Sequence, residues 1–343
     1  MNAVRLRGSR RLVALLAVLA TVSVAAAACS SSTSNSSAGG SKKVSIVGYS
    51  VPKPAYDALE AAFRKTSAGA DVTFTSSFGA SGTQSKSVAS GVLKADYVAF
   101  SVTPDLTNLV PKFVDAGWNS SATKGMVSDS VVVIVVRKGN PLGIKGWDDL
   151  VKPGVKIVTP DPASSGSAKW NVLAAYQHTI SEGGSEADAQ AYLKKFYANV
   201  VSRASSGSTA TTQFVGGTGD VLISYENEAI AARQAGDAVD YIVPDQSVLI
   251  ENPAAVTKDA PAAAKDFLSF VLSDAGQQIF ASKGYRPVVS TTKIATVTGA
   301  EDPSNPFPTP TALTTIAELG GWSAVNAKFF SATGIVTQIA KGS

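Results

Sequence analysis

Small hydroxyl residues and glycines stand directly before several predicted helices of this chain. The stretch "DPASSGSAKWNVLAA" is the clearest case, and "GASGTQSKS" and "ASSGSTATTQF" repeat the pattern. The start of a helix carries unpaired N–H groups and the positive end of the helix dipole. Small residues let an anion approach that backbone, and hydroxyls add donors. The residues concerned are Ser50, Ser81, Ser165, Gly166, Ser167, Ser206 and Gly207.

Each of these serines, taken alone, is explained as a helix cap, which serine commonly supplies. Four such loops at the ends of parallel strands favour a ligand site, because α/β proteins bind ligands there. The pattern therefore predicts an anion site made of N–H groups and hydroxyls, without a carboxylate or another charged side chain.

Motifs for catalysis are poor by comparison. "SATK" and "STTK" place Ser121 and Ser290 three residues before a lysine, as in acyl-serine enzymes, but the S-D-N and K-T-G partner motifs are absent from the sequence. The sequence also lacks a G-x-S-x-G elbow and a phosphate-binding P-loop. We expect no catalytic residue, and a serine hydrolase stays as the alternative from another functional class.

Metal chemistry lacks ligands in this sequence. His178 is the only histidine and Cys29 the only cysteine, so the usual zinc and iron sites cannot be assembled. We expect no metal and no cofactor, and we interpret His178 as a surface or satisfied helical histidine.

The N-terminus predicts export and a lipid anchor. Four arginines precede an apolar stretch, 12–28, that is too short to span a membrane and ends in small residues before Cys29. This resembles a bacterial lipobox and predicts a signal peptide over 1–28 with lipid attached at Cys29; the alternative is a plain secretory signal with a chance cysteine. Residues 29–43, rich in serine and glycine, predict a flexible tether.

Charge excludes nucleic acid as a partner. Removal of residues 1–28 lowers Lys+Arg from 30 to 26, against 26 Asp+Glu, so the mature chain is close to neutral. The 315 residues that remain are enough for two lobes of ordinary size.

Apolar runs of strand length alternate with helical patterns along most of the mature chain, which predicts an α/β fold with mostly parallel sheets. Residues 260–284 predict two consecutive helices, and a final helical stretch follows the proline-rich segment 301–311. Predicted strands include 44–49, 71–78, 95–100, 131–139 and 155–160; predicted helices include 54–65, 85–94, 104–117, one that begins at Ala168, and 186–200. The stretches 221–235 and 241–244 close the alternation.

Several motifs together resemble the periplasmic sulfate-binding proteins of ABC importers. The main block is "VVRKGNPLGIKGWDDLVKPGVKIVTPDPASSGSAKWNVLAA", and "GDVLISYENEA", "GASG", "GYRPV" and "LGGW" also match. The resemblance implies a non-enzymatic type II periplasmic binding fold, in which two α/β lobes joined by crossing strands close on the ligand. It implies a first part of lobe 1 over 44–127, lobe 2 over 128–224, and a return to lobe 1 with C-terminal helices over 225–343.

The resemblance also assigns ligand contacts. Ser165 matches the serine that donates its hydroxyl, and Gly166 and Ser167 match the two backbone donors after it. Ser81 matches the serine of the family's "GGSG" loop, and Ser50 stands where the family commonly has an aspartate whose backbone N–H contributes. One further backbone donor of the family matches Gly207 when positions are counted back from "ATTQF", and Ser206 when they are counted back from "YENEA". Tyr225 stands where the family has a tryptophan whose indole N–H donates, so this contact is left open.

These points predict an extracytoplasmic, lipid-anchored, monomeric receptor that captures sulfate and delivers it to the permease and ATPase of an ABC importer. Alternative ligands are thiosulfate, molybdate and phosphate. Because a protonated phosphate needs an acceptor, a site of donors alone predicts a strong preference for sulfate, largely unchanged between about pH 6 and 8.

Overall fold

The computed structural model describes residues 42–341. Cys29, the signal peptide and most of the tether lie outside the described residues, so the predictions made for them stay predictions. Within residues 42–341, no helix is both long and apolar enough to cross a membrane.

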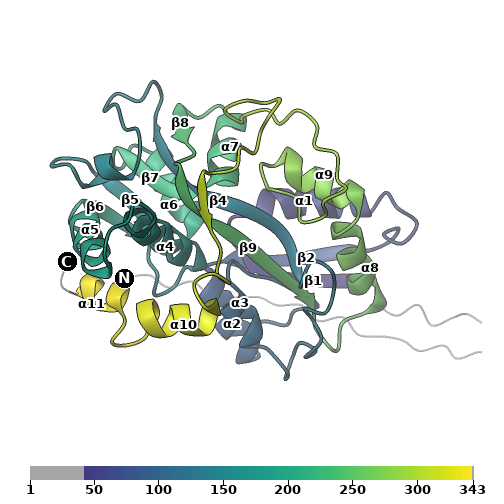
Figure 1. Ribbon diagram of the computed structural model, residues 1–343. Coiled ribbons are helices and arrows are strands. Elements are labelled where there is room, and N and C mark those ends of the chain that lie inside the picture. The colour runs from purple at the N-terminus through teal and green to yellow at the C-terminus, as the bar shows by residue number, and fades with distance from the viewer. Residues whose placement is uncertain (1–41, 342–343) are drawn as a thin grey trace, which may run out of the picture. The chain divides into compact units, whose positions relative to one another are not determined.

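The first part of the chain forms three parallel strands with helices between them (Figure 1). Strand β1 (Lys43–Tyr49) lies between β2 (Thr73–Gly79) and β3 (Tyr97–Ala99). Helix α1 (Lys53–Phe63) buries the face that carries Tyr56, Leu59 and Phe63, because apolar residues three or four apart share one side of a helix. The other two helices are α2 (Ser81–Ala89) and α3 (Thr103–Thr107).

A second set of parallel strands repeats this arrangement farther along the chain. Strand β5 (Ile157–Pro160) lies between β6 (Val200–Ala204) and β7 (Val221–Tyr225). The short 3-10 helix η1 (Trp147–Val151) precedes β5. The helices of this second region are α4 (Gly166–Ser181), α5 (Glu186–Ala198), α6 (Gly207–Val215) and α7 (Glu226–Gln234).

Two long strands join the two parallel regions. Strand β9 (Gln246–Val256) pairs with β3 near its end and with β4 (Met126–Arg137) over Leu249–Pro253, while the second half of β4 pairs with β7. The order in the sheet is β2-β1-β3-β9-β4-β7-β5-β6, with β8 (Val239–Ile242) beside β4 and β10 (Ala312–Thr314) beside β9. The pairs β3–β9, β9–β4 and β4–β7 are antiparallel, so the predicted parallel pairing holds only on either side of this centre.

The C-terminal part contains the two predicted consecutive helices, α8 (Ala262–Val271) and α9 (Asp274–Ser282). The final helical stretch consists of α10 (Gly321–Val325), a π-helical turn over Asn326–Phe330, and α11 (Ile335–Lys341). The predicted helix 104–117 is wrong beyond α3, which has five residues; Pro111 lacks the N–H that a helix needs there. The lobe boundaries fall inside β4 and at the end of β7 and stay predictions.

Candidate functional site

Three helices begin around one buried point at the ends of β2, β5 and β6. A Cβ atom built on Gly166, the first residue of α4, would lie 2.7 Å from the Ser101 side chain and 3.4 Å from the Ser81 Cβ. A Cβ on Gly207, the first residue of α6, would lie 2.9 Å from the Ser167 Oγ. A side chain at either glycine would collide, so both positions require glycine for close approach of the backbones.

Backbone donors gather at this point without acceptors. Within the described chain, no protein acceptor is found for the N–H groups of Ser81, Gly166, Ser167 and Gly207, and all four residues are buried. The first turn of a helix has no internal partner for these groups, and leaving them unpaired and buried costs free energy. The arrangement therefore suits a ligand rich in acceptors, such as an oxyanion.

Ser165 and Ser206 both cap helices but use their hydroxyls differently. The Ser206 Oγ accepts a hydrogen bond of 3.2 Å from the Thr209 N–H, so its hydroxyl belongs to the cap of α6. Ser165 caps α4 without any such bond from its side chain, although only 3 % of the residue is exposed. Its hydroxyl is therefore free to donate to a ligand.

Ser50 lies close to the start of α6, because the next residue, Val51, packs against Gly207. It follows β1 directly, is half-buried, and its carbonyl accepts from the Lys53 N–H at 3.4 Å. The Val51 Cγ2 would lie 2.8 Å from a Cβ on Gly207, which brings the loop after β1 against the start of α6.

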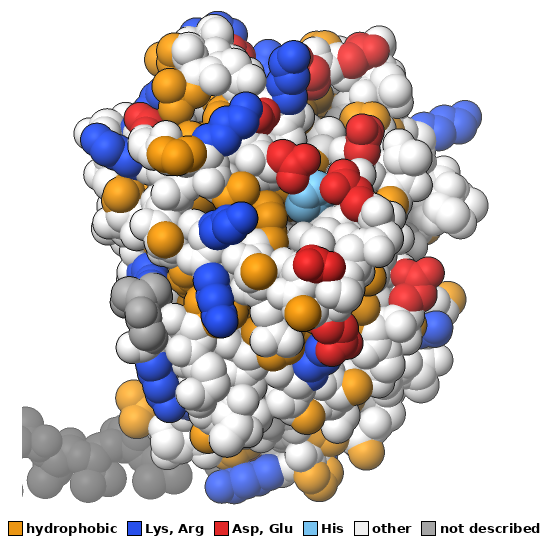
Figure 2. Space-filling view, turned by 60° about the vertical axis from the view of Figure 1, so that its left-hand side comes forward, with side chains coloured by type: hydrophobic (Ala, Val, Ile, Leu, Met, Phe, Trp, Pro, Cys, Tyr) orange, Lys and Arg blue, Asp and Glu red, His pale blue; other side chains and the backbone are white. Residues whose placement is uncertain are grey.

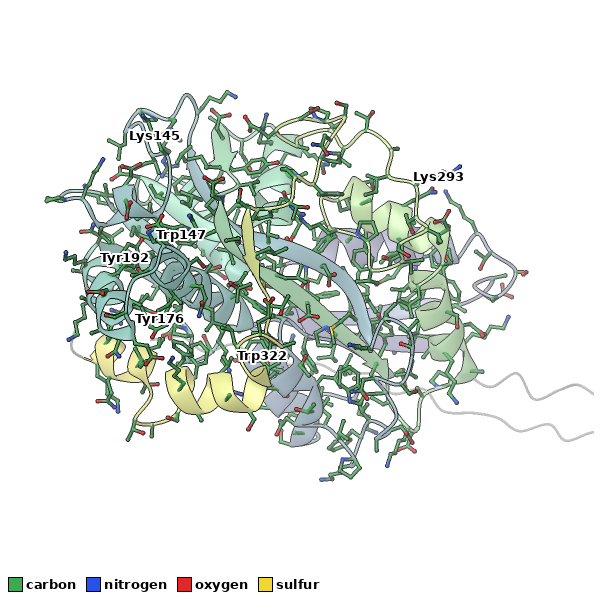
Figure 3. The ribbon with its side chains drawn as sticks, in the orientation of Figure 1. Lys145, Trp147, Tyr176, Tyr192, Lys293 and Trp322 are labelled. Atoms are coloured by element: carbon green, nitrogen blue, oxygen red, sulfur yellow. The ribbon has the colours of Figure 1, made fainter. Side chains whose placement is uncertain are left out.

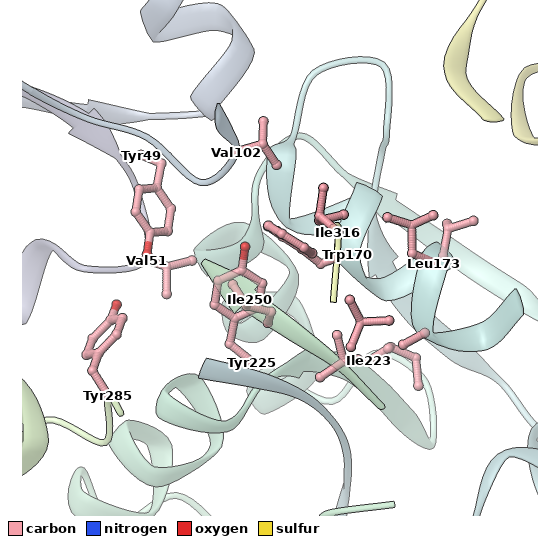
Figure 4. Packing of buried hydrophobic residues seen from close by; sticks show 14 of the residues in the cluster. Tyr49, Val51, Val102, Trp170, Leu173, Ile223, Tyr225, Ile250, Tyr285 and Ile316 are labelled. Atoms are coloured by element: carbon pink, nitrogen blue, oxygen red, sulfur yellow. The ribbon is translucent and has the colours of Figure 1, made fainter. Parts of the chain in front are cut away.

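Tyr225 precedes α7 and is fully buried (Figure 4). Its hydroxyl lies 2.6 Å from the Ser101 Oγ, and the side chains of Ser167 and Asn252 are close by. Burial raises the pKa of Tyr225 well above its usual value, so the phenol stays neutral and brings no negative charge to the site.

Ser101 is a central residue that the sequence reasoning missed. Its N–H donates to the Ser81 Oγ at 3.1 Å, and its carbonyl accepts from Trp170 Nε1 at 2.8 Å and from Asn252 Nδ2 at 3.2 Å. One signal could have found it: like Ser50, it is a serine just past the end of a parallel strand.

Asp105 contradicts the prediction of a site without a carboxylate. The Ser81 hydroxyl donates to the Asp105 Oδ2 at 2.6 Å, so a carboxylate lies one hydroxyl away from the gathered donors. Burial raises the pKa of Asp105, opposed by the Ser81 hydrogen bond and then by the charges of Lys169 and Lys86. The sequence could not show this, because the pair lies 24 residues apart and meets only through the fold.

Comparison with known proteins then fixes the family. The sequence profile of the family described as bacterial extracellular solute-binding proteins matches residues 44–286. The chain belongs to this family.

Individual relatives of this solute-binding protein carry more specific names. It is 35% identical over 330 residues to the sulfate-binding protein of Synechococcus elongatus, covering 92% of each chain. It is 34% identical to the sulfate-binding protein of Escherichia coli, over 86% of this chain and 92% of the other. It is 33% identical to the thiosulfate-binding protein of Pseudomonas aeruginosa, over 70% and 77%.

A solved structure confirms the fold. The sulfate-binding protein SubI from Mycobacterium tuberculosis H37Rv is 43% identical, with a TM-score of 0.78 over 84% of this chain and 99% of that one. The predicted α/β periplasmic binding fold, and membership of a family of binding proteins rather than enzymes, are thereby confirmed.

Two motifs of the solute-binding protein serve its scaffold. Glu226 of "YENEA" and Arg286 of "GYRPV" form a two-pronged ion pair with contacts of 2.8 and 3.0 Å, which ties the start of α7 to the segment after α9. Burial raises the pKa of Glu226 to about 7, although Arg286 opposes this. Burial also raises the pKa of Glu228 to about 7; its carboxylate accepts from the Thr211 hydroxyl.

His178 lies at the other end of α4 from the gathered donors. Its Nε2 is 3.1 Å from an Asp148 oxygen and its Nδ1 is 3.6 Å from a Glu182 oxygen, on a face rich in acidic side chains (Figure 2). The ring stacks on Trp147 and meets the edge of Tyr192, which lie in the same region in Figure 3. The side chains of Asp148, His178 and Glu182 are close enough together to hold a metal ion. The hydrogen bond to Asp148 nevertheless gives the His178 ring a partner, as expected for a helical histidine with a structural role.

The two Ser-x-x-Lys matches lie in exposed positions. The Ser121 hydroxyl pairs with the Thr123 hydroxyl and accepts from the Gly125 N–H, while Ser290 and Lys293 are exposed. Neither match lies among the gathered donors of the solute-binding protein, so the geometry gives the hydrolase alternative no support.

Proposed function

We propose that this solute-binding protein captures sulfate outside the cytoplasm and delivers it to an ABC importer. The observation that carries the proposal is the set of buried backbone N–H groups without protein acceptors at the starts of α2, α4 and α6. Sulfate at neutral pH has no proton and only acceptor oxygens, so a site of this kind matches it. The sulfate-binding names of the relatives support the same ligand.

The ligand contacts proposed here are the residues that the fold brings together. Ser165 gives its hydroxyl, which no cap uses. Ser81, Gly166 and Ser167 give backbone N–H groups, and Ser50 gives its own from the neighbouring loop. For the further backbone donor Gly207 is a better candidate than Ser206, because Gly207 is the first residue of α6 and lies against Ser167.

Tyr225 is proposed to act differently from the tryptophan that the family resemblance implies. Its hydroxyl is paired with the Ser101 hydroxyl, so it supports the residues around it and offers one hydrogen at most. A neutral hydroxyl suits this role, because a phenolate would repel a dianion.

The transport role completes the proposal. The protein works as a monomer that closes around sulfate and docks on the permease of an importer driven by an ATPase. A lipid on Cys29 and the tether over 29–43 hold it at the outer face of the cell membrane.

Calorimetric titration of the purified solute-binding region with sulfate, thiosulfate, molybdate and phosphate tests the ligand, with sodium chloride at matched ionic strength as control. We expect sulfate to bind tightly and phosphate at least about tenfold more weakly, since its proton needs an acceptor and the nearest carboxylate, Asp105, already accepts the Ser81 hydroxyl. Phosphate binding within tenfold of sulfate would contradict the assignment and favour a general oxyanion receptor. Preference for thiosulfate would move the function to the ligand named for other relatives.

A further inference from the structure

The hydrogen bond between His178 and Asp148 uses only one of the two ring nitrogens of the histidine. The Nε2 lies 3.1 Å from an Asp148 oxygen, and only 3 % of His178 is exposed. Within residues 42–341 no hydrogen-bond partner is found for the Nδ1, which is buried as well. A buried polar atom without a partner costs free energy, and a group bound at Nδ1 would recover it.

Glu182 lies next to this nitrogen, too far away for a hydrogen bond but at the separation of two ligands on one metal ion. Its Oε1 is 3.6 Å from the His178 Nδ1. Two ligands of a tetrahedral ion lie roughly 3.4 Å apart, because metal–nitrogen and metal–oxygen bonds are about 2.0–2.2 Å long. His178 is in the last turn of α4 and Glu182 caps that helix four residues later, so both side chains project from the same face.

Asp148 holds the imidazole in the tautomer that a metal site needs. Its carboxylate accepts the hydrogen of Nε2, which leaves the lone pair of the neutral ring on Nδ1. Metal-binding histidines commonly donate their other N–H to a carboxylate, which fixes the ring and makes the ligating nitrogen more basic. One oxygen or nitrogen atom from each of Asp148, His178 and Glu182 lies within 4.8 Å of the other two.

Aromatic neighbours fix the orientation of the His178 ring. The Trp147 ring stacks on it with 6.4 Å between centres, and the edge of Tyr192 meets it at 5.4 Å. The Tyr192 hydroxyl donates to the Trp147 carbonyl at 2.6 Å, which holds these two residues together. The nitrogen is therefore positioned before any ligand arrives, and a ligand loses less free energy on binding.

A metal ion can reach this nitrogen from the solvent. Two surface hollows of about 300 Å³ each are both lined by Asp148, His178 and Glu182. Acidic residues outnumber lysines around them, and Figure 2 shows the ring among acidic side chains. The other charged residues that line the two hollows are Asp149, Asp188 and Asp245, against Lys145 and Lys195. The local charge therefore attracts a cation.

We propose that the His178 Nδ1 and the Glu182 carboxylate bind one divalent transition-metal ion, with Asp148 as the positioning residue. Nitrogen and carboxylate oxygen ligands suit Zn²⁺, and water fills the remaining positions. The ion binds at the C-terminal end of α4, where the helix dipole favours positive charge.

The proposed metal site differs from the expectation of no metal, which was based on the single histidine and cysteine of the sequence. Asp148 lies 30 residues before His178 and meets it only through the fold. The site is at the other end of α4 from the gathered backbone donors, so the inference does not depend on the proposed sulfate function.

The test is calorimetric titration with zinc chloride at one pH, about 7.5, because metal affinity depends on pH. The proteins are mature chains without a polyhistidine tag, and all carry Cys29→Ala, so that no thiol competes for the ion. The parent should bind one ion with a micromolar Kd. His178→Gln, Glu182→Gln and Asp148→Asn should each bind at least about tenfold more weakly. The control Asp266→Asn, which removes an exposed charge from α8, should bind like the parent.

Long-range ¹H–¹⁵N NMR of histidine-labelled protein locates the bond, since only one imidazole contributes to the spectrum. Zn²⁺ should shift the Nδ1 resonance strongly and leave Nε2 protonated. A parent that binds no Zn²⁺ overturns the inference, and so does affinity that is unchanged in His178→Gln or coordination through Nε2. Titration of the metal-free parent with sodium sulfate tests the proposed function separately. If His178→Gln does not fold, the NMR spectrum of the parent still decides the question.

Discussion

Two serines in equivalent positions show how a hydroxyl used in a helix cap differs from one available to a ligand. Ser165 and Ser206 each precede a helix that starts at the candidate site, yet only Ser206 bonds the N–H groups of its own helix. A serine that caps a helix stabilises the fold, whereas one with a free hydroxyl can hold a ligand.

A pair of alanine substitutions separates these roles. Ser165→Ala should weaken sulfate binding about ten- to a hundredfold, because a charge-assisted bond contributes roughly 1.5–3 kcal/mol. Ser206→Ala should lower the free energy of unfolding by about 1 kcal/mol, with a smaller effect on affinity. Titration calorimetry and denaturant unfolding on both variants measure the two quantities. Equal losses of affinity would contradict the assignment of Ser165.

The sequence predicts some of these residues and not others for a physical reason. Ser81, Gly166 and Gly207 are visible in the sequence because small residues before a helix form a local pattern. Ser101 and Asp105 carry no local pattern, since their importance comes from contacts with Ser81 and Tyr225 that only the folded chain creates.

At the scale of elements, α7 is held by buried acidic residues at its start. Glu226 is compensated by Arg286, whereas the only hydrogen-bond partner found for Glu228 within the described chain is the Thr211 hydroxyl. A buried carboxylate without a cation is costly when ionised, which is why burial raises the pKa of Glu228 to about 7.

Glu228→Gln should therefore change the pH dependence of stability. The folded state holds this proton more tightly than the unfolded state, whose pKa is near 4.5, so the free energy of unfolding falls as pH rises from about 4.5 to about 7. The variant should be more stable than the wild type at pH 8, by on the order of 2 kcal/mol, and similar to it near pH 4.5. Denaturant unfolding without sulfate measures the free energy of unfolding at each pH, with Glu301→Gln as the exposed control. A stability difference between Glu228→Gln and the wild type that stays constant across pH would contradict a raised pKa of Glu228 as the cause.

The elements themselves were predicted unevenly from the sequence. Helices α5, α8 and α9 were predicted at nearly their observed positions, because each has a regular apolar face. Strand β9 was missed, because Glu251, Asn252 and Pro253 interrupt its apolar pattern in the middle of the sheet. Its partners on both sides are far away in the sequence, so no local signal marks it.

At the scale of the whole molecule, the predicted membrane anchor and the folded, ligand-binding region are different parts of the chain. The described residues hold the fold and the candidate site, while the predicted anchor lies at Cys29, outside them. One acyl chain gives only marginal membrane binding, whereas two give a stable anchor.

Cys29→Ala tests the anchor in the native host. The substitution should move the protein from the membrane fraction to the soluble or culture fraction, because the attachment atom is lost. Fractionation with immunodetection measures the change, and Ser31→Ala in the tether is the control. Unchanged membrane association of Cys29→Ala would show that the protein is held there by other means.

The position of β9 between β3 and β4 also determines when a newly made chain can finish folding. Strand β3 ends at Ala99, but the residue that pairs with it there, Ala254, is synthesised much later. Such long-range pairing is slow to form, and the centre of the sheet cannot close until β9 has left the ribosome. The β3–β9 and β4–β9 pairs can therefore form only late in translation, which leaves the growing chain without its central sheet while a secretion channel for unfolded chains could still thread it.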